Sequence, residues 1–116
     1  MTDSASDQCN WEIAPTEVAR MLSDGEDVVL IDCRTPEEHE IARIAGAINI
    51  PLQELSVRLG ELRPYEERPI VVHCHMGKRS MTVTAVLREL GFENVRSMSG
   101  GIHRWSEEVD PNVPKY

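Results

Sequence analysis

Residues 70–80 read Ile-Val-Val-His-Cys-His-Met-Gly-Lys-Arg-Ser, and this stretch carries the strongest signals for both fold and chemistry. It opens with β-branched, aliphatic residues, which are typical of a strand covered on both faces in a parallel sheet. A short loop starts at Cys74. Apolar residues then recur at helical spacing, at Val83, Val86, Leu87 and Leu90. The stretch therefore predicts a strand–loop–helix unit of an α/β fold.

The same alternation of strands and helices runs through the rest of the chain. Strands are expected at residues 11–13, 28–31, 46–50, 70–73 and 94–98. Helices are expected at residues 15–22 and 52–62, and further helices are expected to begin at residue 36, after residue 80 and at residue 100 or 101. This order predicts a three-layer α/β domain, with a five-stranded parallel sheet flanked by helices on both faces. Ligands of such sheets bind outside the carboxyl ends of the strands, where Asp32, Cys33 and Cys74 fall. Ile102 and Trp105 are expected in the core.

Length and composition indicate a single domain. The chain has 116 residues, of which 41% are hydrophobic, and a net charge of −8. We expect a flexible N-terminal lead at 1–10, a domain at 11–110 and a C-terminal tail at 111–116. No apolar run approaches the ~20 residues of a membrane span. The acidic balance argues against nucleic-acid and anionic-lipid partners.

The cysteines are few and far apart: Cys9, Cys33 and Cys74. No C-x-x-C pair is present, which excludes a zinc ribbon and a thioredoxin-type motif. His73, Cys74 and His75 are adjacent, and neighbouring strand residues point to opposite faces, so they do not converge on a metal ion. We expect no metal and no cofactor. Free thiols, a polar and acidic start without a targeting segment, and the lack of heptads together predict a cytoplasmic monomer.

The loop after residue 73 has the residues of an anion or thiolate site. Residues 68–88 contain four basic side chains and no acidic one. Backbone N–H groups of a strand-to-helix loop, with the helix N-terminus, can converge on the Cys74 sulfur and favour its thiolate. Gly77 suits a turn that needs positive φ. Ser80 can cap the helix or donate its hydroxyl to the sulfur.

Several segments, taken in order, resemble the rhodanese-like domain family of single-domain sulfurtransferases. The loop 74–80 is similar to that family's C-x-x-G-x-R-S/T loop, and 32–38 is similar to its Asp-x-Arg-x-x-x-Glu segment. Residues 44–51 resemble its Ile-x-Gly-Ala-x-Asn-Ile-Pro segment, and 100–105 its closing Gly-Gly…Trp element. The resemblance runs from about 13 to 105. It departs at residues 42–43, where Ala-Arg stands in place of the family's frequent Gly-His.

The resemblance implies a sulfurtransferase that works without a cofactor. Cys74 would be the nucleophile that takes sulfane sulfur from thiosulfate or a persulfidated protein and becomes a persulfide. It would then pass the sulfur to cyanide, a low-molecular-weight thiol or a thioredoxin-like protein. The substrate-binding residues implied by the loop are His75, Met76, Gly77, Lys78, Arg79 and Ser80. Their backbone would hold the outer sulfur, and Lys78 and Arg79 would attract the anionic part of the donor.

The segment before the second helix is expected to serve structure. Asp32 and Arg34 are interpreted as structural residues, with Arg34 paired to Glu37 or Glu38 to stabilise a turn. Cys33 is expected to end a strand next to that of Cys74 and could then act as a resolving thiol, although a small buried cysteine is the commoner case.

Alternative functions stay open at this point. A non-catalytic rhodanese-like module could use the loop to bind or regulate a partner. A cysteine-dependent phosphatase or arsenate reductase would need a C-x5-R loop, whereas Arg79 follows Cys74 by five places and Ser80 occupies the sixth. Such an enzyme would also need an acid for the leaving group. His73 and Asp32 could serve, but no motif supports either.

Overall fold

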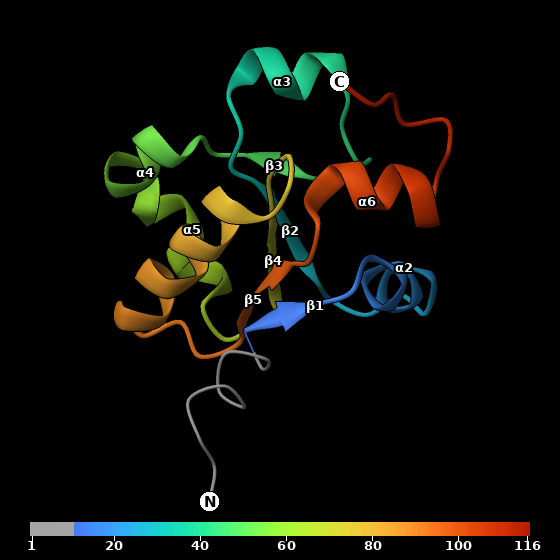
Figure 1. Cartoon of the computed structure of the whole chain (residues 1–116). Helices are drawn as coiled ribbons and strands as arrows, with labels where there is room; N and C mark the ends of the chain where they lie inside the picture. The colour runs from blue at the N-terminus through green and yellow to red at the C-terminus, as the bar shows by residue number, and fades with distance from the viewer. Residues whose placement is uncertain (1–10) are drawn as a thin grey trace, which may run out of the picture.

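The computed structural model describes residues 11–116, and the expected lead at 1–10, with Cys9 in it, lies outside this range. One sheet runs through the centre of the molecule (Figure 1). Its strands are β1 (Glu12–Ile13), β2 (Val29–Asp32), β3 (Ile48–Asn49), β4 (Ile70–His73) and β5 (Val95–Met98). They are all parallel, in the order β1-β5-β4-β2-β3. The predicted five-stranded parallel sheet is confirmed.

Helices cover both faces of the sheet. They are α2 (Pro15–Ser23), α3 (Pro36–Ile41), α4 (Leu55–Leu62), α5 (Lys78–Glu89) and α6 (Gly101–Glu108), with 3₁₀ turns η1 (Leu52–Glu54) and η2 (Arg63–Tyr65). Figure 1 shows α4 and α5 on one face, α2 and α6 on the other, and α3 across one end. The three-layer arrangement is therefore confirmed. Within residues 11–116 no helix is long and apolar enough to cross a membrane.

Two local expectations were imprecise. The helix expected over 52–62 begins as a separate 3₁₀ turn, and its α-helical part starts at Leu55 without a side-chain cap. Leu90, expected on the buried face of α5, is 41% exposed. The reason is that α5 ends at Glu89, and Gly91 then takes a φ of +101° and turns the chain away.

Strand side chains alternate between two cores. The core under α4 and α5 receives Ile31 and Cys33 from the β2 segment and Val72 and Cys74 from the β4 segment. The core under α2 and α6 receives the intervening Leu30 and Val71, together with Ile102 and Trp105. The last two residues are core residues, as expected. The alternation places the Cys33 and Cys74 side chains on the same face of the sheet.

The expected pairing of Arg34 with Glu37 or Glu38 is wrong. Arg34 is fully buried, and its side chain donates to the Asp32 carboxylate at 2.8 and 2.6 Å and to the carbonyl of Ala42. Asp32 ends β2 inside the protein, so its charge needs a partner there, whereas Glu37 is exposed to water and Glu38 pairs with Arg79. Removing one member of such a buried pair typically costs about 3–5 kcal/mol.

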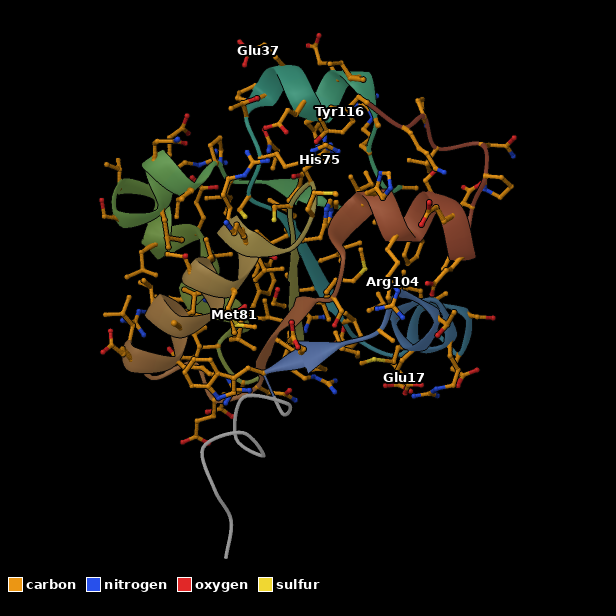
Figure 2. The ribbon with its side chains drawn as sticks, viewed as in Figure 1. Glu17, Glu37, His75, Met81, Arg104 and Tyr116 are labelled. Carbon is orange, nitrogen blue, oxygen red and sulfur yellow. The ribbon has the colours of Figure 1, made fainter. Side chains whose placement is uncertain are left out.

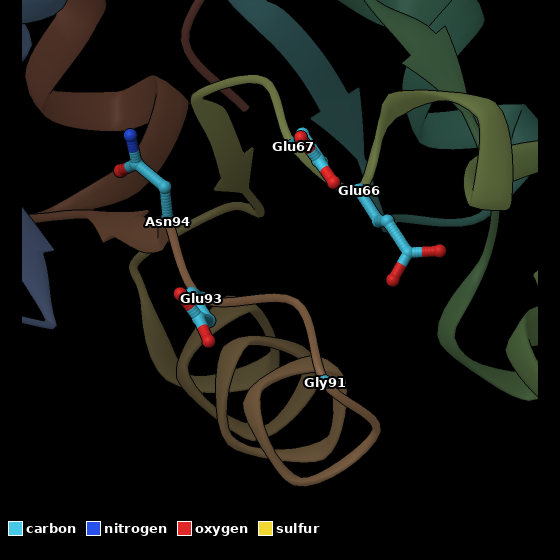
Figure 3. A pocket seen from close by; sticks show the side chains of 5 residues that line it. All are labelled: Glu66, Glu67, Gly91, Glu93 and Asn94. Carbon is cyan, nitrogen blue, oxygen red and sulfur yellow. The ribbon is translucent and has the colours of Figure 1, made fainter.

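One hollow lies far from the cysteine loop. Figure 3 shows its lining: Glu66, Glu67, Gly91, Glu93 and Asn94. These residues precede β4 and β5, so the hollow lies at the amino ends of the strands, opposite the end that carries Cys74. Its lining has three carboxylates and an amide and includes no nucleophilic side chain. The chemistry indicated by the sequence therefore belongs to the other end of the sheet.

Candidate active site

The loop between β4 and α5 wraps around the Cys74 sulfur. Cys74 directly follows β4, and its Sγ accepts hydrogen bonds from the backbone N–H groups of Gly77, at 3.1 Å, and Ser80, at 3.3 Å. The Ser80 hydroxyl lies 3.4 Å from the same sulfur. Gly77 precedes α5 with a φ of +109°, as expected for a residue free of Cβ. The loop therefore forms a ring of donors around one sulfur atom.

The N-terminus of α6 binds the backbone of this loop through hydrogen bonds. The N–H groups of Ile102 and His103 donate to the carbonyls of Cys74 and His75, at 2.8 and 3.1 Å. Gly101 makes the approach possible, since a Cβ there would lie 2.3 Å from the His75 carbonyl oxygen. The Gly-Gly pair therefore allows α6 to come close enough to hold the loop backbone.

The surroundings stabilise the Cys74 thiolate. A hydrogen bond from the Cys33 thiol lowers the pKa of Cys74 most, and the hydroxyl and N–H of Ser80 and the N–H of Gly77 lower it further. Burial acts in the opposite direction, yet the pKa of Cys74 falls to about 4. The pKa of Cys33 is raised by its hydrogen bond to Cys74 and by burial. The backbone donors converge on Cys74, so Cys74 carries the charge and Cys33 keeps its proton.

Cys33 and Cys74 lie side by side. Asp32, the last residue of β2, is in register with His73, the last residue of β4, and the two cysteines are the next residues. The N–H of Cys33 donates to the His73 carbonyl at 3.0 Å, which continues the ladder to that point. Both cysteines are 1% exposed and free. The expectation that Cys33 ends a strand next to that of Cys74 is confirmed.

The charged side chains of the loop differ in their partners. Arg79 forms two hydrogen bonds with the Glu38 carboxylate, at 2.7 and 3.0 Å. These bonds hold the pKa of Glu38 well below its usual value. Lys78 is exposed and makes no ion pair within residues 11–116. Of the two cations expected to attract an anion, only Lys78 is therefore unpaired.

The C-terminal segment closes over the loop, and the sequence contained no sign of this contact. The Tyr116 ring stacks on His75, with ring centroids 4.1 Å apart and planes 15° apart, and Figure 2 shows the two side by side. Its hydroxyl donates to Glu38 at 2.7 Å and accepts from Arg34 at 2.9 Å. Tyr116 therefore connects the loop with the buried Asp32–Arg34 pair. Met76, at the tip of the loop, is 58% exposed.

His73 takes no part in the sulfur site. Its ring lies on the opposite face from Cys74, is fully buried, and has no partner for either nitrogen. Burial lowers the pKa of His73 to about 4, so the ring is neutral at neutral pH. Asp32 is ionised, since hydrogen bonds from Arg34 outweigh burial and lower its pKa. No group of three potential metal ligands occurs within the described part of the chain.

Replacing Ser80 with alanine is expected to raise the pKa of Cys74 by about one unit, because the thiolate loses a hydroxyl donor. The pH dependence of Cys74 alkylation by iodoacetamide measures this shift. Thr82→Ala is the matched control, since it removes an exposed hydroxyl from the same helix. Equal pKa values in the wild type and Ser80→Ala would contradict the role given to Ser80.

His73 is expected to make the fold sensitive to acid. The pKa of His73 is about 4 in the folded state and about 6.5 in the unfolded chain, so between these values only the unfolded chain binds the proton. This group's contribution to the unfolding free energy is therefore full above pH 6.5 and falls by about 3 kcal/mol as the pH drops to 4. Urea unfolding of His73→Val should show a shallower decline over this range than the wild type. An equally steep decline would contradict this account.

The geometry and the comparisons agree on a family. A family model described as rhodanese-like domain matches residues 14–108. A protein of Allochromatium vinosum named "Sulfurtransferase" is 33% identical over 102 residues, which cover 88% of this chain and 94% of that protein. The structure of the human single-domain sulfurtransferase TSTD1 matches with a TM-score of 0.74 and 29% identity, covering 84% of this chain and 96% of that one. The chain belongs to the rhodanese-like domain family.

Other relatives are much longer. The Zea mays protein named "Adenylyltransferase and sulfurtransferase MOCS3-2" is 33% identical over 126 residues, which cover all of this chain but only 26% of that protein. The chain thus spans about a quarter of the length of such relatives.

Proposed function

We propose that this chain is a sulfurtransferase that carries sulfane sulfur on Cys74. The observation that carries the proposal is the set of polar groups around one buried sulfur: two backbone N–H groups and a serine hydroxyl. A thiolate at neutral pH is the reactive form of a cysteine nucleophile. The names of the similar proteins, which include sulfurtransferases of similar length, support the same class of reaction.

The reaction has two displacement steps. In the first, the Cys74 thiolate attacks the outer sulfur of a donor such as thiosulfate. A bond forms between the two sulfurs, and the donor's sulfur–sulfur bond breaks to release sulfite with the electron pair. In the second, a nucleophile such as cyanide or a thiolate attacks the outer sulfur of the persulfide, and Cys74 leaves as the thiolate. Loop N–H groups stabilise the negative charge on sulfur in both steps.

The exposed side chains next to Cys74 indicate which kinds of sulfur donor and acceptor the site would favour. Lys78 is exposed and unpaired beside the loop, which favours an anionic donor such as thiosulfate or the persulfide of a partner protein. Met76 offers an exposed apolar contact, which suits an acceptor protein of the thioredoxin-like class as well as a small thiol. Donor and acceptor are thus both sulfur compounds, and nucleic acid and membrane have no part in the proposal.

The phosphatase alternative has less support. Its loop would place an arginine at position 80, where Ser80 instead donates to the cysteine sulfur, and Arg79 is held by Glu38. Neither candidate acid suits the task. Asp32 is ionised and buried in its pair with Arg34, and His73 lies on the other face of the sheet.

Intact mass spectrometry tests the proposal. After incubation with thiosulfate or a small persulfide donor, the protein should gain about 32 Da, one sulfur atom, and should lose it on addition of cyanide. Hydrolysis of a generic aryl phosphate is the parallel assay, and it should be negligible. If neither donor adds mass, the result would support the alternative that the chain is a non-catalytic module that binds or regulates a partner. Phosphate release at enzymatic rates would support the phosphatase.

A further inference from the structure

We infer that Cys33 and Cys74 act as a dithiol pair that discharges the Cys74 persulfide internally, forming a disulfide and releasing hydrosulfide. This inference rests on the proposed function, since it begins from the loaded persulfide. The sulfur on Cys74 would then have two fates: transfer to an external nucleophile, or reduction and release as hydrosulfide.

The backbone places the two cysteines where a disulfide can form. They follow the in-register pair Asp32 and His73 at the ends of adjacent parallel strands. Neighbouring strands lie about 4.7–4.9 Å apart, and disulfides join Cα atoms about 4.4–6.8 Å apart. Both side chains enter the core under α4 and α5, so their sulfurs face the same way. The Cys33 thiol is near enough to the Cys74 sulfur to lower the pKa of Cys74, which agrees with this placement.

The chemistry of the step balances without an added oxidant. The Cys33 sulfur forms a bond to the inner sulfur of the persulfide, Cys74 Sγ, and the persulfide's sulfur–sulfur bond breaks. The outer sulfur takes the electron pair and the proton of the Cys33 thiol and leaves as hydrosulfide. The sulfane sulfur is reduced, and the two cysteines are oxidised to a disulfide. An external dithiol, the chemical class of the thioredoxin-like acceptor, then reduces the disulfide by exchange and restores both thiols.

Burial favours the internal thiol over outside competitors. Both cysteines are 1% exposed, so solvent thiols have little access to the inner sulfur. Cys33 is held next to Cys74 by the register of the two strands, and a fixed neighbour reacts with a high effective concentration. Cys33 also holds the proton that the leaving sulfur needs, because its pKa is raised by Cys74 and by burial.

The test follows one loaded protein over time without oxygen. Wild type and Cys33→Ser are treated with a small persulfide donor, freed of excess donor and sampled by intact mass and a sulfide assay. In the wild type the gain of about 32 Da should give way to a species about 2 Da lighter than the reduced protein, with one hydrosulfide per disulfide. Peptide mapping should join Cys33 to Cys74 and leave Cys9 unlinked. Cys33→Ser keeps a hydroxyl donor beside Cys74 and should hold its added sulfur at least about tenfold longer.

The outcomes separate this inference from the proposed function. Equal lifetimes of the added sulfur in wild type and Cys33→Ser, with no linked peptide, would overturn the inference and leave sulfur transfer standing. No added sulfur in either protein would overturn both. Cys33→Val provides a second comparison that removes the donor as well as the thiol and keeps an apolar side chain in the core. It too should form no disulfide, and an equally fast loss of its added sulfur would count against the role of Cys33.

Discussion

Cys74→Ser is expected to lose sulfur transfer by at least about 10³-fold, because the hydroxyl of serine is not ionised at neutral pH and forms no persulfide. The fold should survive the change, since the side chain is of similar size and the N–H groups of Gly77 and Ser80 can donate to oxygen. The measurement pairs the initial rate of thiocyanate formation from thiosulfate and cyanide with the thermal unfolding midpoint.

Two results would contradict this expectation. A Cys74→Ser protein that retains more than a tenth of the wild-type rate would show that another group carries the sulfur. A protein that loses activity only because it is unfolded would leave the nucleophile unassigned, so Cys74→Ala is measured beside it. Both variants should remain folded and should gain no sulfur mass.

Gly101→Ala is expected to be the most damaging small substitution in the described chain. Gly101 has a φ of +63°, which disfavours a side chain, and the new Cβ would lie 2.3 Å from the His75 carbonyl oxygen. The backbone must therefore move, and the hydrogen bonds from α6 to the carbonyls of Cys74 and His75 are lost. We expect a loss of about 3 kcal/mol or more in the unfolding free energy, and slower sulfur loading.

Gly60→Ala is the matched control. Gly60 lies within α4, and a Cβ there would meet no atom within 4 Å. The same substitution should stabilise the protein by up to about 1 kcal/mol, because alanine favours the helix. Chemical denaturation of both variants gives the comparison. If Gly101→Ala is as stable as the wild type, α6 does not support the loop in the way described.

The central strands and the loop could be predicted because their signals are local. The apolar runs at 28–31 and 70–73 mark strands covered on both faces, and the structure has β2 and β4 there. The cysteine, glycine and serine of the loop lie within seven residues, so their convergence follows from one strand-to-helix turn. The strand ends at Cys33 and Cys74 could also be predicted, whereas the pairing of β2 with β4, which puts the two cysteines next to one another, comes from the structure.

The contacts around the loop could not be predicted because they join distant segments. Glu38 pairs with Arg79, 41 residues away, and with Tyr116, 78 residues away. A sequence pattern does not show which of several nearby carboxylates an arginine will choose. Arg34 was assigned to Glu37 or Glu38 from proximity alone, whereas the cost of burying Asp32 unpaired selects the Asp32–Arg34 pair. In the structure Glu38 also forms a capping box with Thr35 at the start of α3, which fixes its backbone but does not select Arg79 as its partner.

The ionisation of Cys74 is the claim on which the proposed chemistry depends, and a pH titration of thiolate absorbance tests it most directly. The spectrum of Cys74→Ser is subtracted from that of the reduced wild type at each pH. One thiolate should persist in the difference spectrum from pH 9 down to pH 6, because the pKa of Cys74 is about 4. A difference signal that disappears with a midpoint near the ordinary cysteine value of about 8.5 would show that Cys74 is protonated at neutral pH and would contradict the proposed chemistry.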